Sequence, residues 1–224
     1  MILFLISIIP VEIGLRIDYC TIDHFNNHFQ FLENKASTLG WNGSFSRFGH
    51  FLYSPILETH FITIENFSTS ICFSYFHDKN EGNFAYNTTI DTFRLREIWS
   101  YWQLPIDVKL NLNIGPIIFT SGFEFSYTKL TVDAQANYQM NENYPRFFDS
   151  FDIGLFAGFC KDFKMIQLQI FYNYARIDQF HNREKYLYYD ENEGYIYTGP
   201  ENHGDPSAVL NHSGIGVNIL YRLF

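Results

Sequence analysis

Histidines and carboxylates are the residues of this sequence that could most readily support chemistry. His24 and His28 stand four residues apart beside Asp23, a spacing that could hold a metal ion if the segment were helical. Five carboxylates in a later segment could bind a hard cation through oxygen, although their spacing is not that of an EF-hand. They are Asp190, Glu191, Glu193, Glu201 and Asp205. A solvated loop is the simpler interpretation of both sets, so we predict no metal site and no cofactor.

Three further histidines raise the question of an enzyme. His50, His60 and His212 lie in or near segments with a strand pattern, with serines not far away. No spacing connects them into a triad, and the chain has no GxSxG, HExxH or glycine-rich phosphate loop. We therefore predict no enzyme and no catalytic residue, and keep a hydrolase as the third alternative.

A tyrosine-rich stretch overlaps the acidic segment, within 183–206. Tyrosine is enriched at binding interfaces, so this stretch could contact a ligand or a protein partner. Its tyrosines are Tyr186, Tyr188, Tyr189, Tyr195 and Tyr197. An ordinary external loop is the simpler interpretation. The three cysteines, Cys20, Cys72 and Cys160, have no CxxC spacing and indicate small buried side chains.

The elements that would position these residues are β-strands. In the segment 102–127, WQLPIDVKLNLNIGPIIFTSGFEFSY, apolar and polar residues alternate on both sides of a short connection expected at 111–113. Such alternation indicates strands with one apolar and one polar face. The same pattern predicts further strands, eight in all. They cover about 11–19, 47–61 and 69–75, two that begin near Phe93 and Ile114, and then 151–159, 166–174 and 215–223.

The predicted connections alternate in length. Long ones are expected at 21–46, 77–91, 130–147 and 177–208, and short ones near 65–66, 111–113 and 161–164. An even number of strands with this asymmetry is typical of outer-membrane barrels, which have short periplasmic turns and long external loops. We therefore predict an all-β protein, a closed up-and-down antiparallel transmembrane β-barrel. Pro55 falls inside the predicted strand 47–61, whose alternation is blurred. Pro105 cannot donate a ladder hydrogen bond and indicates a bulge or a locally unpaired position.

The polar face is expected to line the lumen. Acids and bases mix on it, as suits a narrow lumen filled by ion pairs, and we expect Lys109 to pair with a carboxylate. The charged residues are Glu12, Arg16, Asp18, Asp107, Lys109, Glu124, Asp152 and Arg222. Glycines share that face, and aromatic residues stand toward the strand ends of the other, as in membrane-interface girdles. They include Tyr19, Trp102, Tyr127, Tyr174 and Tyr221. A soluble lipocalin-like barrel with its apolar face inward is the alternative.

Composition bounds the remaining possibilities. The chain has 224 residues, 20% of them aromatic, and a net charge of −9, which argues against a nucleic-acid partner. No apolar run is long enough for a membrane-spanning helix. Residues 1–10, MILFLISIIP, match the core of a signal peptide in length, so we expect a signal remnant at 1–10 and a single barrel domain at 11–224.

Several motifs are similar to those of the PorT-like outer-membrane β-barrel family of Bacteroidetes. That family's strand of the form Y-x-E-I-P-L-L-L-K, followed by Gly-Pro, resembles residues 101–109, YWQLPIDVK, and Gly115-Pro116. Residues 151–177 resemble its next hairpin, and 214–224 its last strand. The chain departs from the pattern at Gln103, where glutamate is usual. Phe224 also lies one residue out of phase with the outward series.

The resemblance implies a location and a role. It implies the outer membrane of a Gram-negative bacterium, lipid contacts, and recognition of the last strand by the barrel assembly machinery. It also implies an accessory role in secretion of proteins across that membrane. From the residues and the resemblance together we expect a structural or interaction protein with partners at its external loops. The runner-up is a soluble barrel that binds a small hydrophobic ligand.

Overall fold

The computed structural model describes residues 10–20, 23–139, 145–180, 187–190, 195–198, 207–208 and 214–223. Within these residues the chain is almost entirely β-structure, with one helix. The first elements are β1 (Val11–Cys20), α1 (Asp23–Thr38), β2 (Asn42–Phe45), β3 (Phe51–Ile64), β4 (Phe67–Ser74) and β5 (Phe76–Asn87). Then come β6 (Thr92–Ile114), β7 (Ile117–Ala136), β8 (Arg146–Phe163) and β9 (Ile166–Phe180). The last are β10 (Leu187–Asp190), β11 (Tyr195–Thr198), β12 (Ser207–Ala208) and β13 (Gly214–Arg222).

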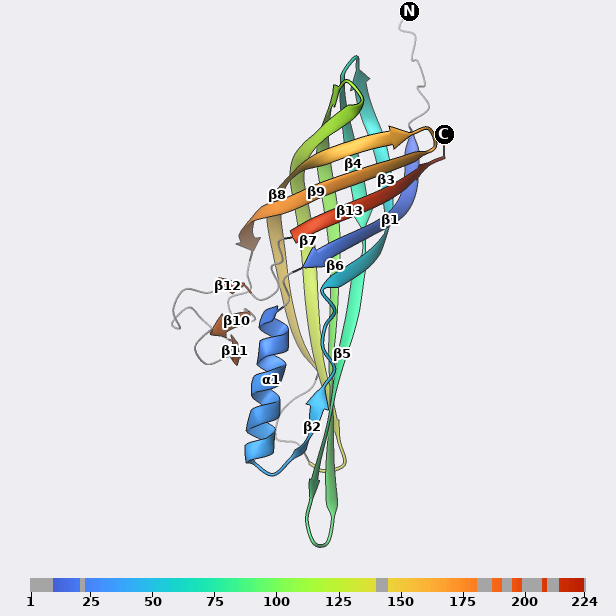
Figure 1. Ribbon diagram of the computed structural model, residues 1–224. Coiled ribbons are helices and arrows are strands. Elements are labelled where there is room, and N and C mark those ends of the chain that lie inside the picture. The colour runs from blue at the N-terminus through green and yellow to red at the C-terminus, as the bar shows by residue number, and fades with distance from the viewer. Residues whose placement is uncertain are drawn as a thin grey trace, which may run out of the picture.

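Eight of these strands close into an antiparallel barrel, which confirms the predicted fold class. The ring runs β1-β3-β4-β6-β7-β8-β9-β13, and β13 pairs with β1 to close it. The start of β1, the end of β13 and the short turns lie at one end, which we call the turn end (Figure 1). Helix α1, β2 and the β5–β6 hairpin lie at the other, the cap end (Figure 1). The short turns between ring strands therefore gather at one end of the barrel, as predicted.

The predicted position of one turn is wrong by a few residues. Residues 111–113 continue β6 and pair with β7, and the chain reverses at Gly115, whose φ of +64° suits a residue without Cβ. Asn111 and Asn113 are residues common in loops, which is why a connection was expected here, but both continue the register of the strand. The turns at Glu65 and Lys164 also contain a left-handed residue.

Two segments expected to be loops are largely strand. Residues 77–87 belong to β5, and β6 and β7 continue past the ring toward the cap end (Figure 1). The predicted loop at 77–91 is therefore corrected to a turn at 88–91, and residues 130–136 and 146–147 of the other predicted loop are corrected to parts of β7 and β8. These segments alternate as well, but their outward face is polar, so their composition resembles that of loops.

Two prolines mark the place where β4 gives way to β5. The β3–β4 ladder ends at Ile56 and Ser74, one residue before Pro55, which has no N–H to donate. Ser54 spans this break: its Oγ accepts from Tyr75 N (2.6 Å) and donates to the Pro55 carbonyl (2.7 Å). Pro105 falls between the β4–β6 and β5–β6 ladders and is unpaired on that side only, because it pairs in register with Ser126 of β7.

The segment predicted as the first long loop, 21–46, contains α1 and β2. The helix has sixteen residues and contains His24 and His28. In the described part of the chain, no helix combines the length and the apolar character needed to cross a membrane. The segment predicted as the last long loop, 177–208, is corrected in its described residues: β9 continues to Phe180, and β10 pairs with β11 and β12 in a separate small sheet.

The apolar face of the barrel points outward. The large exposed side chains of the wall include Leu15, Leu57, Leu104, Ile106, Leu110, Phe123 and Ile219. The opposite face is buried and polar, with Arg16 and Glu58 at 0% and Lys109 at 2% exposed. This arrangement confirms the predicted orientation of the two faces.

Candidate functional site

One group of lumen side chains is organised around Arg16. Its guanidinium donates to Asp18 (3.0 Å), Asp107 Oδ2 (3.0 Å) and Glu124 Oε2 (2.8 Å). These carboxylates come from β1, β6 and β7, so a single cation connects three strands of the ring. All four side chains are buried, and their charge-assisted bonds offset the cost of removing them from water.

A second lumen group is organised around Lys109. Its Nζ donates to Glu58 Oε2 (2.7 Å) and to Gln169 Oε1 (2.8 Å). Glu58 also accepts from Ser70 Oγ (2.6 Å), and Asn218 donates to Gln169 (2.9 Å). The predicted pairing of Lys109 with a carboxylate is therefore present, and the group connects β3, β4, β6, β9 and β13.

His60, one of the three histidines considered for an enzyme, lies at the turn end of the lumen. His60 Nε2 lies 3.7 Å from Glu12 Oε2 and 4.0 Å from Glu58 Oε1, and Arg222 Nε donates to Glu12 (2.9 Å). Ser70 stands opposite His60 in the β3–β4 register, but its hydroxyl donates to Glu58. The serine proton is directed to a carboxylate, which is not the order of a nucleophilic triad. His50 stacks on Tyr19, with ring centroids 5.6 Å apart.

Strand β6 changes the polarity of both its faces at one level. Its outward series is Arg94, Arg96, Ile98 and Ser100, followed by Trp102, Leu104, Ile106, Val108 and Leu110. Its inward series is Leu95, Glu97, Trp99 and Tyr101, followed by Gln103, Asp107, Lys109 and Asn111. Toward the cap end the strand is largely polar outside and largely apolar inside, and toward the turn end the reverse holds, with Pro105 as the apolar exception on the inward face.

The neighbouring strands invert at the same level. On β7 the outward face changes from Phe123, Phe125 and Tyr127 to Lys129, Thr131 and Asp133. Its inward face changes from Glu124, Ser126 and Thr128 to Leu130, Val132 and Ala134. Where β4 passes into β5, outward Tyr75 is followed by His77, Lys79 and Glu81. Register places the changes side by side, because Trp102 pairs with His77 and with Lys129.

Beyond the level at which β5, β6 and β7 exchange polarity, their inward side chains pack with α1, and we call this packed region the cap. The cap core consists of Phe29, Phe45, Phe48, Leu52, Phe76, Phe84, Trp99, Tyr101, Leu130 and Val132. Phe29 of α1 is at its centre, 4.6 Å from the Phe45 ring and 5.2 Å from Trp99 between centroids. These rings lie over the cap end of the lumen, since Phe76 also contacts the Arg16 guanidinium at 5.4 Å.

Polar side chains attach α1 to the edge strand β2 and the segment after it. Glu33 Oε1 accepts from Phe45 N (2.6 Å), and Arg47 donates to Glu33 (2.6 Å) and to the Phe45 carbonyl (3.0 Å). The hydrogen bond and charge of Arg47 lower the pKa of Glu33. Asn26 donates to the Phe48 carbonyl and accepts from its N–H. The free edge of β2 is thereby blocked at Phe45, as is common at exposed sheet edges.

His28 belongs to the cap. It is buried on the inner face of α1, 5.4 Å from the Trp99 ring between centroids, and burial lowers its pKa to about 4. The side chain of its predicted partner, His24, lies outside the described residues. No three His, Cys, Asp or Glu side chains of the described chain are grouped to hold a metal ion.

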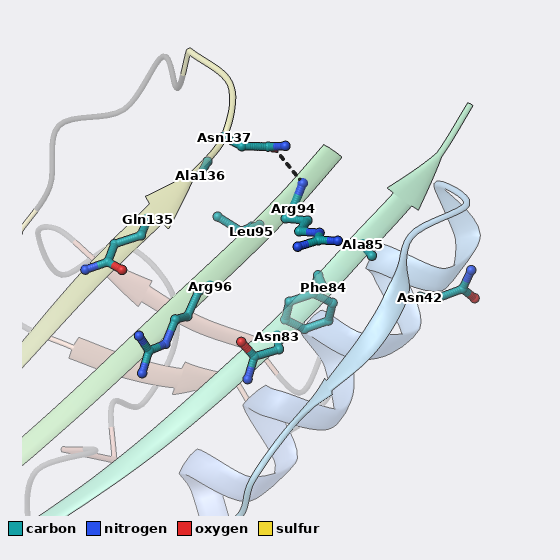
Figure 2. Close-up of a pocket in the computed structure, with 10 residues that line it drawn as sticks. All are labelled: Asn42, Asn83, Phe84, Ala85, Arg94, Leu95, Arg96, Gln135, Ala136 and Asn137. Atoms are coloured by element: carbon teal, nitrogen blue, oxygen red, sulfur yellow. Dashed lines mark hydrogen bonds between the residues drawn. The ribbon is translucent and has the colours of Figure 1, made fainter. Parts of the chain in front are cut away.

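The outward face of the same region forms what we call the platform, a four-stranded sheet of β2, β5 and the cap-end parts of β6 and β7. A groove of about 550 Å³ lies on it. Figure 2 shows Asn83, Arg96 and Gln135 on three neighbouring strands, with Arg94 bonded through its N–H to Asn137. Arg96 makes a two-point pair with Glu81 (2.6 and 2.7 Å), which lowers the pKa of Glu81 to about 2.

Sequence reasoning missed the platform, although a signal was present. Asn83 and Ala85 alternate with Phe84, and Arg94 and Arg96 alternate with Leu95, as in strands with one buried face. Several predicted positions lie outside the described residues: the side chains of Asp152, of the acidic set 190–205 and of the tyrosines between 186 and 197, together with His212 and Phe224. Cys72 and Cys160 are buried and unpaired by disulfide, as expected.

No protein-family model matches the chain, and no curated protein matches it either.

The Lys109 pair yields a prediction about barrel stability. Lys109→Met leaves Glu58 buried without its cation, so we expect a loss of about 3–5 kcal/mol in the free energy of unfolding. The measurement is thermal unfolding of the folded chain. Lys164→Met, at an exposed turn, is the matched control, with an expected change within about 0.5 kcal/mol. A Lys109→Met variant that melts no lower than the parent would contradict the role of the pair.

His28 yields a prediction about pH. Its pKa is lowered in the folded cap from 6.5 to about 4, so the unfolded cap binds the extra proton and stability falls as pH drops through that window. Between pH 7.5 and pH 5 we expect the cap to lose about 2 kcal/mol. Hydrogen exchange of α1, corrected for intrinsic rates, measures this loss. His28→Gln should abolish it, and an unchanged pH response in that variant would rule His28 out as its source.

Proposed function

We propose that this chain is a small outer-membrane β-barrel with a structural and interaction role, which presents its platform on the side of the long connections. The observation that carries the proposal is the inversion of polarity at one level of β5, β6 and β7. If water surrounded the strands on both sides of that level, nothing would favour an exchange of polarity between their outward and inward faces. A hydrocarbon layer around the turn end, with water around the cap end, accounts for both faces at once.

The height of the apolar wall supports this proposal. On β6 the outward apolar series runs from Trp102 to Leu112, ten residue steps or roughly 33 Å along the strand. At a tilt of about 40° this spans roughly 25 Å, the height of the apolar band of outer-membrane barrels. Aromatic side chains mark the limit of the apolar wall toward the cap end, among them Tyr19, Tyr53, Tyr75, Trp102 and Tyr127. Such residues favour the membrane interface.

The lumen supports an interaction role over transport. An eight-stranded barrel is just wide enough to be filled by side chains, and here bonded ions and amides fill it below an aromatic cap. A role as an accessory to protein secretion rests on the family resemblance alone. A soluble barrel that binds a small hydrophobic ligand is the second candidate, and an outer-membrane hydrolase the third.

Two matched substitutions on β6 test the proposal. Ile106→Arg places a charge in the middle of the apolar wall, whereas Ile98→Arg places it on the same face of the same strand beyond the inversion level. If lipid surrounds the wall, Ile106→Arg should cost about 2–4 kcal/mol and Ile98→Arg close to nothing. The measurement is urea titration of chains folded into lipid vesicles, with the folded species detected by its faster migration on unboiled gels.

The two alternatives predict different results. If the parent chain is a monomer in plain buffer without detergent, the membrane proposal fails and the soluble barrel takes its place. Equal effects of the two arginine substitutions would also count against a membrane boundary between them. Labelling of the folded chain by an active-site serine probe would favour the hydrolase.

A further inference from the structure

The groove on the platform has the chemistry of a ligand site. Register aligns its outward side chains in two rows across the four strands. One row is Ser44, Asn83, Arg96 and Gln135, and the other is Asn42, Ala85, Arg94 and Asn137. Figure 2 shows Asn83, Arg96 and Gln135 of the first row, and the whole of the second row.

The charge of the groove is opposite to that of the chain. Its ten lining residues include Arg94 and Arg96 and no carboxylate, although the chain has 24 acidic and 15 basic residues. Glu81 fixes Arg96 through Nε and Nη2, which leaves Nη1 unoccupied by that pair. The Arg94 guanidinium has no ion-pair partner among the described residues. The groove therefore offers positive charge to an anionic ligand.

The uncharged groups of the groove suit hydroxyl groups. Carboxamides both donate and accept, as sugar hydroxyls do. The Asn42 and Gln135 amides have no hydrogen-bond partner among the described residues, and Asn83 uses its Nδ2 on Glu81 and keeps its Oδ1. Asn137 is occupied, because it accepts from Arg94 N (2.8 Å) and donates to the Thr92 carbonyl (2.9 Å). It holds the end of β7 against β6.

We propose that this groove binds an acidic oligosaccharide, with Arg94 and Arg96 contacting its carboxylate and Asn42, Asn83 and Gln135 its hydroxyls. A peptide that adds as a further strand fits less well, because Glu33 and Arg47 occupy the edge groups of Phe45. A lipid headgroup is a less suitable ligand, because the groove lies far from the expected membrane surface. Arg94 lies eight residues beyond Trp102, roughly 25 Å along the strand from the aromatic level.

The test uses the full chain folded in detergent and isothermal titration with tetragalacturonate, a chain of four uronic acid units. We expect saturable binding, at least tenfold weakened by Arg94→Gln because one charge-assisted contact is lost. The neutral galactose tetramer should bind at least tenfold more weakly than the acidic one. Lys164→Gln removes the same charge at the turn end and should leave affinity unchanged.

Four results would overturn the inference. They are no binding by the folded chain, equal binding by Arg94→Gln, equal affinity for the neutral tetramer, and equal affinity for inorganic phosphate or for a tetraglutamate peptide. The inference rests on the proposed display of the platform at a membrane surface. Its failure is distinguishable from failure of that proposal, because a chain that folds only in detergent and does not bind contradicts the oligosaccharide alone.

Discussion

The period-two alternation of β6 and β7 is the constraint on which the rest of the structure depends. A strand assigns each side chain to one of two faces and cannot exchange them without a bulge. These two strands are among the longest of the chain and run without interruption from the turn end into the cap end. Their outward and inward faces must therefore exchange polarity within the sequence wherever the surroundings change. The lumen network, the aromatic cap and the polar platform are consequences of that exchange.

Packing inside the lumen shows how tightly the ionic groups are held. A Cβ added at Gly216 would collide with the Phe171 ring and with Asp18, and one at Gly122 with the Val108 carbonyl. The absent side chain at Gly216 leaves space for Phe171, whose ring lies 4.8 Å from the Arg16 guanidinium. Arg16 therefore has aromatic contacts in addition to its carboxylates, and cation–π attraction is strongest where water is excluded. The glycines predicted on the lumen face thus have a steric purpose.

Much of the barrel could be predicted from the sequence because alternation is a local signal. All eight ring strands, the orientation of their faces and the pairing of Lys109 followed from residue order. Helix α1 was expected to be a loop, because its apolar residues face a core supplied largely by β5 and β6, which are distant in sequence. Strand β5 was missed because its outward face is as polar as a loop, and only the buried partners Phe76 and Phe84 distinguish it. The platform groove depends on the register between strands, which cannot be read from a single sequence.

The platform is joined to the barrel wall by more than continuous strands. Phe76 belongs to the cap core, yet its ring also lies 5.4 Å from the Arg16 guanidinium in the lumen. Arg16 is held in turn by carboxylates from β1, β6 and β7. The same aromatic core contacts the inner face of the sheet whose outer face carries Arg94 and Arg96. A groove built on this sheet is therefore held in a fixed orientation to the barrel axis. That rigidity lowers the entropic cost of binding, because its side chains stand on paired strands and not on a free loop.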